Sequence, residues 1–154
     1  MLAQREKPTG GVLSVSPVEQ DHIQIESILG SVPLASPAGR TWRVSRAGSL
    51  ATALIAVRQA KFAVILCESS LGADSWKDLI AGAAGLMESS VLIVTSLHAD
   101  EHLWAEALNL GVYDVLAKPF RQAELSRAVE LGCMRWQRQQ RDAGSPMHAR
   151  VASC

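Results

Sequence analysis

The stretch Val-Leu-Ala-Lys-Pro-Phe, residues 115–120, joins a short apolar run to a polar turn. Such a run is typical of a buried strand, and Lys118 would then lie at the carboxyl end of that strand. Parallel α/β sheets bind their ligands in the crevice outside the carboxyl ends of their strands. The proline also permits a cis peptide bond between Lys118 and Pro119. An ordinary turn would explain these residues as well, so the rest of the chain must decide between the two interpretations.

Three earlier apolar runs also stop at a polar residue. They are residues 12–15 before Ser16, residues 62–67 before Glu68 and residues 91–94 before Thr95. A weaker strand candidate covers residues 41–44. Between these runs, apolar residues recur at helical spacing, and the segments open on residues that favour helix starts. The expected starts are Ser16 with a capping box to Glu19, Ser49, Ser75, Asp100 and Arg121.

Strands and helices therefore alternate five times along the chain, which is the pattern of a doubly wound α/β fold. We expect a five-stranded parallel sheet of order 2-1-3-4-5 with helices on both faces, because right-handed crossovers favour that order. The folded domain is expected to span residues 12–138. Residues 1–11 are expected to form a flexible lead-in, residues 30–39 a loop and residues 139–154 a disordered tail.

Composition narrows the class of protein. Of the 154 residues, 48% are hydrophobic, enough for one core, and the formal net charge is zero. This balance implies no nucleic-acid or anionic-membrane surface. No apolar run approaches the ~20 residues of a membrane span, and the first residues are too polar for a signal peptide. The cysteines and histidines show no metal-ligand spacing, so we expect a cytoplasmic protein without a zinc site or disulfides.

This layout, together with Thr95 and Lys118-Pro119-Phe120, resembles the receiver domain of response regulators over residues 12–138. The resemblance implies a flavodoxin-like fold with a phosphorylation crevice at the strand ends. In that family, an acidic pair after the first strand and an aspartate after the third hold Mg²⁺. The aspartate accepts a phosphoryl group from a histidine kinase or a small phosphodonor. A Ser or Thr after the fourth strand and a Lys after the fifth bind the phosphoryl oxygens.

Position by position, the match to this family is partial. Thr95 and Lys118 match the two residues that bind the phosphoryl oxygens, and Glu68 lies where the phosphoacceptor aspartate belongs. The acidic pair is replaced by Ser16 and Pro17, two residues that helix capping alone would also explain.

These departures bear on phosphorylation. Mg²⁺ is usually held by one or two carboxylates together with phosphate oxygens, and Glu68 is the only acid we expect in the crevice. We therefore expect weak or absent Mg²⁺ binding and a lost or very slow aspartyl-phosphate reaction. If Lys118 and Thr95 lie within reach, Glu68 would make a charge-assisted contact that imitates part of the phosphorylated state. Alternatively, Glu68 is a solvated loop acid and Thr95 caps the loop after its strand.

The leading hypothesis is a single-domain receiver that acts as a protein-interaction module in two-component or phosphorelay signalling, not as an enzyme. Its partner would be a histidine kinase, a downstream regulator or a second copy bound through the last two helices, where exposed Trp104 or Trp136 would strengthen the case. In the family, a switch residue in the fifth strand reports to that face, and Val115 occupies its position. Two alternatives stay open: a phosphoacceptor that uses an unconventional acid, and an α/β domain that binds a small molecule. The modest charge of the last helix suits a solvated face, which argues against nucleic acid as a partner.

Overall fold

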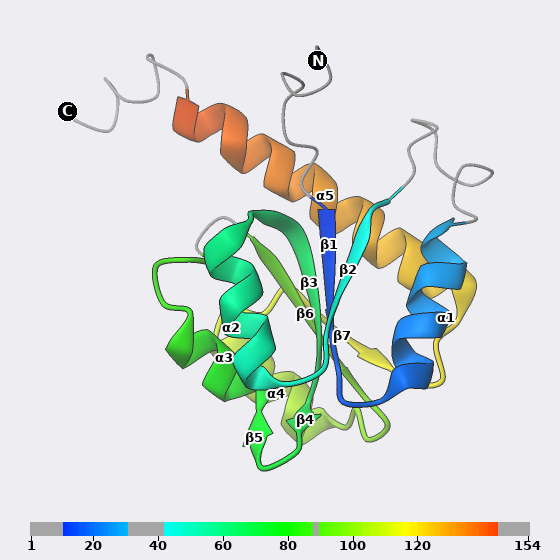
Figure 1. Ribbon diagram of the computed structural model, residues 1–154. Coiled ribbons are helices and arrows are strands. Elements are labelled where there is room, and N and C mark those ends of the chain that lie inside the picture. The colour runs from blue at the N-terminus through cyan, green and yellow to red at the C-terminus, as the bar shows by residue number, and fades with distance from the viewer. Residues whose placement is uncertain (1–10, 31–41, 88–89, 145–154) are drawn as a thin grey trace.

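The computed structural model describes residues 11–30, 42–87 and 90–144. In this part of the chain, five parallel strands form one sheet, which Figure 1 shows with helices around it. The strands are β1 (Gly11–Val15), β2 (Val44–Ala47), β3 (Phe62–Glu68), β6 (Val91–Ser96) and β7 (Asp114–Ala117). Their order is β2-β1-β3-β6-β7, so the predicted order 2-1-3-4-5 and the α/β fold class are confirmed. A short antiparallel hairpin, β4 (Ser70–Leu71) and β5 (Asp74–Ser75), is an addition to the predicted strands.

Helices cover both faces of the sheet. They are α1 (Glu19–Gly30), α2 (Leu50–Gln59), α3 (Trp76–Gly82), α4 (Glu101–Asn109) and α5 (Gln122–Gly144). Helices α1 and α5 pack over one core cluster, and α2, α3 and α4 pack over a second cluster on the opposite face (Figure 1). Among the described residues, none of these helices combines the length and the apolar composition that a membrane span requires.

Strand β3 lies at the centre of the sheet, and all of its residues are buried. Its side chains alternate between the two cores: Val64 and Leu66 face α1 and α5, whereas Ile65 and Cys67 belong to the other cluster. A strand covered by helices on both faces must be apolar at successive positions, as residues 62–67 are. Pairing with β6 then fixes the position of Glu68 at the carboxyl end of the strand.

Capping contacts confirm three of the predicted helix starts. Ser49 caps α2 and Ser75 caps α3, each by accepting a hydrogen bond from a backbone amide of its helix. The Asp78 carboxylate completes a capping box by accepting from the Ser75 amide. Asp100 caps α4 in the same manner. These side chains satisfy amides that a helix leaves unpaired at its first turn, so the sequence defines where each helix begins.

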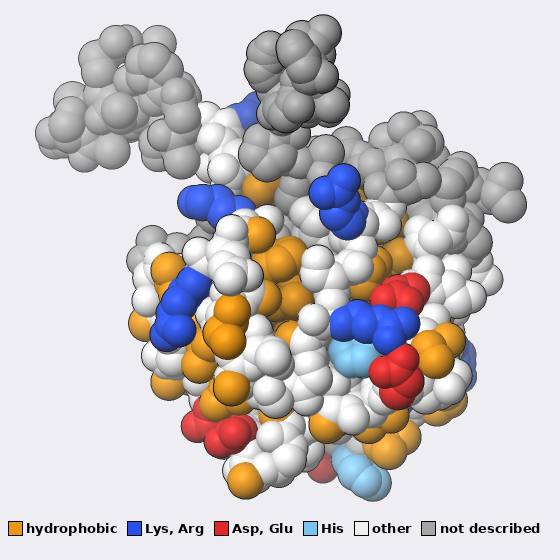
Figure 2. All heavy atoms as spheres, viewed as in Figure 1, with side chains coloured by type: hydrophobic (Ala, Val, Ile, Leu, Met, Phe, Trp, Pro, Cys, Tyr) orange, Lys and Arg blue, Asp and Glu red, His pale blue; other side chains and the backbone are white. Residues whose placement is uncertain are grey.

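The first helix begins later than predicted. Helix α1 starts at Glu19 rather than at Ser16, and the Glu19 carboxylate pairs with Arg46 of β2 at 2.5 Å instead of closing a capping box. Arg46 also binds Glu26 at 2.6 Å, and Figure 2 shows basic and acidic side chains side by side over α1 and β2. Arg46, which is distant in sequence, therefore binds the carboxylate of Glu19 that the local pattern placed in a capping box.

The second strand also differs from its prediction. It comprises Val44–Ala47 rather than residues 41–44, and residue 41 lies outside the described residues. Strand β1 pairs with this segment along its whole length, from Val44 through Ala47. Pairing with β1 thus sets the bounds of this strand, and of the predicted residues only Val44 belongs to it.

The last helix is longer than predicted. Helix α5 runs to Gly144, past the expected end at Arg138, because the glutamines and arginines that follow are good helix formers. Three predicted irregular segments fall mostly outside the described residues, namely residues 1–10 of the lead-in at 1–11, residues 31–39 of the loop at 30–39 and residues 145–154 of the tail at 139–154. Their described ends are regular instead: Gly11 begins β1, Gly30 ends α1 and residues 139–144 belong to α5.

Candidate functional site

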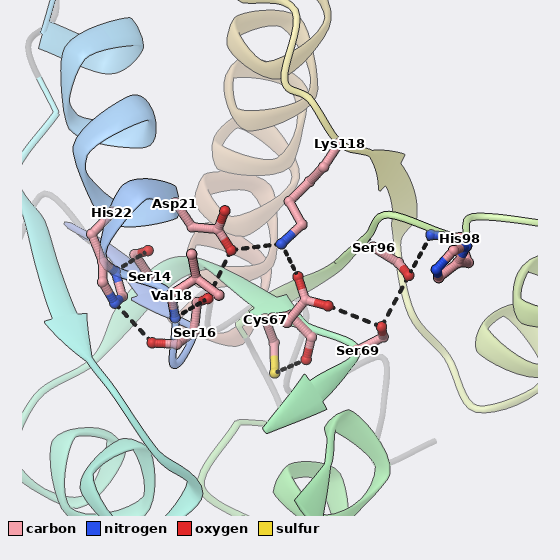
Figure 3. Close-up of polar contacts among 11 residues, drawn as sticks. Ser14, Ser16, Val18, Asp21, His22, Cys67, Ser69, Ser96, His98 and Lys118 are labelled. Atoms are coloured by element: carbon pink, nitrogen blue, oxygen red, sulfur yellow. Dashed lines mark hydrogen bonds and ion pairs between the residues drawn. The ribbon is translucent and has the colours of Figure 1, made fainter. Parts of the chain in front are cut away.

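Three charged side chains meet at the carboxyl end of the sheet. Lys118 follows β7, Glu68 ends β3, and Asp21 lies in the first turn of α1. The Lys118 ammonium lies 2.7 Å from Asp21 Oδ2 and 2.5 Å from Glu68 Oε1; Figure 3 shows the lysine side chain pointing toward Asp21. The side chains of Lys118 and Asp21 are 8% exposed and that of Glu68 is 10% exposed. These three residues, called here the charged trio, are therefore largely shielded from water.

The backbone after β7 directs Lys118 toward the centre of the sheet. Its amide donates a hydrogen bond to the Ser96 carbonyl at the end of β6 (2.9 Å), and the Lys118–Pro119 peptide bond is cis. Strand β6 lies between β7 and β3 in the sheet. The long lysine side chain therefore passes the end of β6 to reach Glu68 on β3.

Asp21 shows that the expectation of Glu68 as the only acid in the crevice is wrong. The Ser16 hydroxyl donates to Asp21 Oδ2 (2.7 Å) and accepts from the Val18 amide (3.0 Å), while Pro17 is exposed. Ser16, at one of the two expected acid positions, thus positions a carboxylate instead of supplying one. Sequence reasoning missed Asp21 because it lies within the first helix rather than at a strand end. The available signal was an acid in a helix's first turn, where the helix dipole favours negative charge.

A buried histidine fixes this turn of α1 against β1. His22 is 3% exposed; its Nε2 lies 2.9 Å from the Ser16 carbonyl oxygen and its Nδ1 lies 2.8 Å from the Ser14 hydroxyl. Because a carbonyl oxygen can only accept, Nε2 carries a proton, and in the neutral ring Nδ1 accepts from Ser14. These contacts join α1 to β1 and hold the adjacent Asp21 at the crevice.

The second oxygen of Glu68 is also engaged. The Ser69 hydroxyl donates to Glu68 Oε2 (3.1 Å) and lies 3.0 Å from Ser96 Oγ, which in turn accepts from the His98 amide (3.0 Å). A residue that is 8% exposed and held in this way is not a solvated loop acid, so that alternative is wrong. The contact between Glu68 and Lys118 is instead present. Sequence reasoning did not predict that Ser69 and Ser96 would take part in this network. Their position at strand ends was the signal available.

Thr95 lies beside the charged trio without joining it. It is 3% exposed, pairs in register with Glu68, and its carbonyl accepts from the Ser69 amide (2.8 Å). Among the described residues, the hydrogen bonds of Lys118 and Glu68 do not include the Thr95 hydroxyl. Val115, at the predicted switch position, is 4% exposed and belongs to the core cluster on the α2, α3 and α4 face of the sheet. The roles of Thr95 and Val115 in phosphoryl binding and switching stay predictions.

Burial and the two carboxylates act in opposite directions on Lys118. Burial lowers the pKa of the Lys118 ammonium, contacts with Asp21 and Glu68 raise it, and the net result is a pKa above the ordinary value of lysine. Lys118 is therefore cationic at neutral pH. Burial, followed by the negative charge of Glu68, raises the pKa of the Cys67 thiol to about 12. That thiol is consequently neutral, and it packs as a small apolar side chain.

The side chains of this crevice do not fit the Mg²⁺ that the resemblance implies. Mg²⁺ requires oxygen ligands at about 2.0–2.1 Å in a near-octahedral arrangement. Both carboxylates of the trio contact one ammonium, which a metal ion would have to displace. In the part of the chain that the structure describes, no group of three or more His, Cys, Asp or Glu side chains is placed to hold a metal ion. The crevice thus presents a cation already bound.

No protein-family model and no curated protein matches the sequence of this chain. Solved structures do match its fold. The signal receiver domain of a putative LuxO repressor protein from Vibrio parahaemolyticus is 17% identical with a TM-score of 0.76, over 88% of this chain and 98% of that one. A CheY-like response regulator receiver domain protein from Methanospirillum hungatei is 16% identical with a TM-score of 0.71, over 84% and 98%. The signal receiver domain of an HD domain-containing protein from Pseudomonas fluorescens is 19% identical with a TM-score of 0.70, over 83% and 97%.

These low identities establish a shared architecture rather than shared chemistry. Each match nevertheless covers almost the whole of the known receiver domain and most of this chain. The strand order of the sheet agrees with that architecture. The protein therefore has the fold of the response-regulator receiver domains.

Proposed function

We propose that the protein is a signalling module of the two-component or phosphorelay type that acts by binding a partner protein, without ordinary Mg²⁺-dependent aspartyl phosphorylation. One observation carries the proposal: Lys118, at the position of the phosphoryl-binding lysine, is already bound by two buried carboxylates. The receiver fold and the glutamate at the end of β3 support it.

Phosphoryl transfer into this crevice would meet unfavourable electrostatics. The reaction depends on positioning and on neutralising the charge of the phosphoryl oxygens. The charged trio contains two carboxylates and one ammonium, so its net charge is already negative before a phosphoryl group arrives. To bind the phosphoryl oxygens, Lys118 would have to leave both carboxylates and thereby uncover two buried negative charges. We therefore expect the reaction to be absent or very slow.

We also propose that the charged trio holds the domain near one conformation. Lys118 connects the end of β7 to β3 through Glu68 and to α1 through Asp21. The Glu68 carboxylate occupies the place where, by the resemblance, phosphoryl oxygens would meet the lysine. Charge-assisted contacts shielded from water are stronger than neutral hydrogen bonds. A partner would thus meet a constant surface, and signalling would follow the abundance of the two proteins rather than phosphorylation.

Helix α4 offers a surface for such a partner. Trp104 and Leu108 lie one turn apart on α4, and Leu110 follows the helix; they are 36%, 56% and 47% exposed. Exposed aromatic and apolar side chains favour protein contact. Trp136, the second tryptophan considered for this face, is 6% exposed and belongs to the core under α1 and α5, so it is not available. The candidate partners are a histidine kinase, a downstream regulator and a second copy of this chain.

The test of the chemistry is incubation of the 154-residue chain with acetyl phosphate and Mg²⁺, followed by intact-mass measurement and peptide mapping. A phosphorylatable receiver domain serves as the positive control, and we expect no phosphoryl group on the wild-type crevice. Glu68→Asp is the comparison variant: labelling of that variant alone would show that the extra methylene of Glu68 blocks the reaction. A phosphoryl group mapped to Glu68 or Asp21 of the wild-type protein would refute the proposal and favour a working phosphoacceptor.

The test of the surface uses sedimentation velocity, because a second copy is the one partner whose identity is already known. We expect the wild-type protein to self-associate and Leu108→Glu to weaken that association. Ile55→Glu is the matched control, because Ile55 is an apolar side chain of similar exposure (49%) that lies on α2 rather than on α4. A monomeric wild-type protein, or equal sensitivity to both variants, would exclude a homodimer through α4 and leave the kinase or regulator as the partner.

A further inference from the structure

We propose that a pocket at the amino end of the sheet, on the opposite edge from the charged trio, binds small uncharged aromatic molecules. The pocket, called here the α3–α4 pocket, has a volume of about 230 Å³ and lies between the ends of helices α3 and α4. Its lining includes Ile80, Gly85, Met87, Leu92, Leu110 and Gly111. The inference does not rest on the proposed function, because no residue of the charged crevice takes part in it.

Small residues leave this space open. Helix α3 ends at Gly82, and Ala83, Ala84 and Gly85 follow it. A Cβ atom built on Gly85 or Gly111 would meet no other part of the chain within 4 Å. Both glycines have a positive φ, 83° and 86°, a conformation that larger residues disfavour. The turns after α3 and α4 therefore keep this part of the pocket free of side chains.

The α3–α4 pocket reaches the hydrophobic core. Leu92 on β6 is 6% exposed, and Ile80 and Met87 pack against the same core cluster. Leu110, which is 47% exposed, adds an apolar side chain at the surface. An apolar molecule in this pocket would remove water from side chains that are continuous with the core, and the hydrophobic effect favours that transfer.

The lining offers no charge to a ligand. Among the described residues, those that line the pocket carry no titratable side chain. Ser90 supplies its polar side chain, and the Ser90 hydroxyl already donates to the Phe62 carbonyl oxygen (2.7 Å). The other polar groups belong to the backbone, which can orient an N–H or O–H group but cannot neutralise an ion. A charged ligand would lose its hydration without gaining a counter-ion, so the pocket selects an uncharged one.

Volume and side-chain chemistry narrow the class of ligand. An apolar cavity of about 150 Å³ binds benzene, whereas drug-sized ligands occupy about 300–1,000 Å³. The α3–α4 pocket lies between these sizes and therefore suits one ring or two fused rings. Met87 favours an aromatic ligand, because a thioether makes favourable contacts with aromatic rings and its flexible side chain adapts to their shape. Indole, with two fused rings and one N–H group, is a probe of this class.

The experiment titrates the 154-residue chain with indole and follows the side-chain methyl groups by two-dimensional NMR. We expect saturable shifts at Ile80, Met87 and Leu92, which report occupation of the pocket. Val18 and Leu97 are exposed apolar residues at the carboxyl end of the sheet, 43% and 65% exposed, and serve as internal controls. Their methyl groups should not show saturable shifts.

Two variants and two further probes sharpen the test. Ala84 lines the pocket and is exposed, so Ala84→Leu should fill the space and weaken indole binding at least about tenfold. Ala81→Leu is the matched control, because Ala81 is an exposed alanine of α3 outside this lining; it should leave the affinity unchanged. Benzyl alcohol should bind at least about tenfold more tightly than benzylamine, a cation of nearly the same size.

Four results would overturn the inference. The first is the absence of saturable shifts at the methyl groups of the pocket, and the second is equally large shifts at Val18 and Leu97. The third is an Ala84→Leu variant that binds indole as tightly as Ala81→Leu does, and the fourth is equal binding of benzylamine and benzyl alcohol. If Ala84→Leu lacks the native circular dichroism spectrum, the methyl shifts of the wild-type protein and the two benzyl compounds decide.

Discussion

Replacement of Lys118 by methionine should destabilise the folded protein far more than the same replacement of Lys77. Both lysines contact carboxylates at similar distances, but the Lys118 side chain is 8% exposed and the Lys77 side chain is 47% exposed. Removing one partner of a buried ion pair leaves an uncompensated charge and costs about 3–5 kcal/mol. Water and salt screen the exposed pair, so its loss should have little effect on the free energy of unfolding.

Urea denaturation followed by circular dichroism measures this difference. The slope of the unfolding free energy against urea is about 1–3 kcal/mol/M for small proteins, so a loss of about 3 kcal/mol lowers the midpoint by at least about 1 M. Lys77→Met should leave the midpoint unchanged within error. Equal slopes for the two variants are required, because only then does a shift of the midpoint report a change in stability.

Removing both acids together with the lysine should recover part of the lost stability. The variant Asp21→Asn/Glu68→Gln/Lys118→Met carries no charge in the crevice, and neutral replacement of a whole buried ionic group is often tolerated. The reasoning is refuted if Lys118→Met shifts the urea midpoint no further than Lys77→Met does. It is also refuted if the triple variant is less stable than Lys118→Met.

Alkaline pH, thiol chemistry and helix packing provide three further tests. Because the folded-state pKa of Lys118 is raised, its ion pairs stabilise the protein fully below the unfolded-state pKa and lose that effect as pH rises through the folded value. The urea midpoints of the wild-type protein and Lys118→Met should therefore converge above about pH 10, and a constant difference would contradict this. The Cys67 thiol, whose pKa is raised to about 12, should resist iodoacetamide at neutral pH and react in urea, as peptide mapping would show; labelling of the native protein would disprove its burial. A Cβ atom on Gly132 would lie 3.2 Å from the side chains of Val64 and Val91, so Gly132→Leu should cost about 1–3 kcal/mol and lower Tm, whereas an unchanged Tm would mean that α5 can shift.

The strand order could be predicted because its causes are local. Continuous apolar runs at residues 62–67 and 91–94 require cover on both faces, and Ser75 and Asp100 mark helix starts that the structure confirms. Few topologies remain once strands and helices alternate with right-handed crossovers. Boundaries were less predictable wherever a distant residue intervened, as Arg46 does when it binds Glu19 at the start of α1.

The candidate site could be predicted only in part. Glu68 and Lys118 both follow apolar runs, so their meeting at the edge of the sheet followed from the topology. Asp21 follows no strand, and its contact with Lys118 joins positions 97 residues apart. Chain spacing carries no information about such a contact, which depends on how Ser16 and His22 orient the first turn of α1.

The amino-acid sequence alone determined the alternating fold and placed a glutamate, a threonine and a lysine at strand ends, because apolar periodicity and capping act over a few residues. Only the tertiary structure decided that Lys118 is neutralised by two acids and largely shielded from water. The strength of an ion pair depends on the distance between its charges and on the surrounding dielectric, and both are properties of the packed molecule.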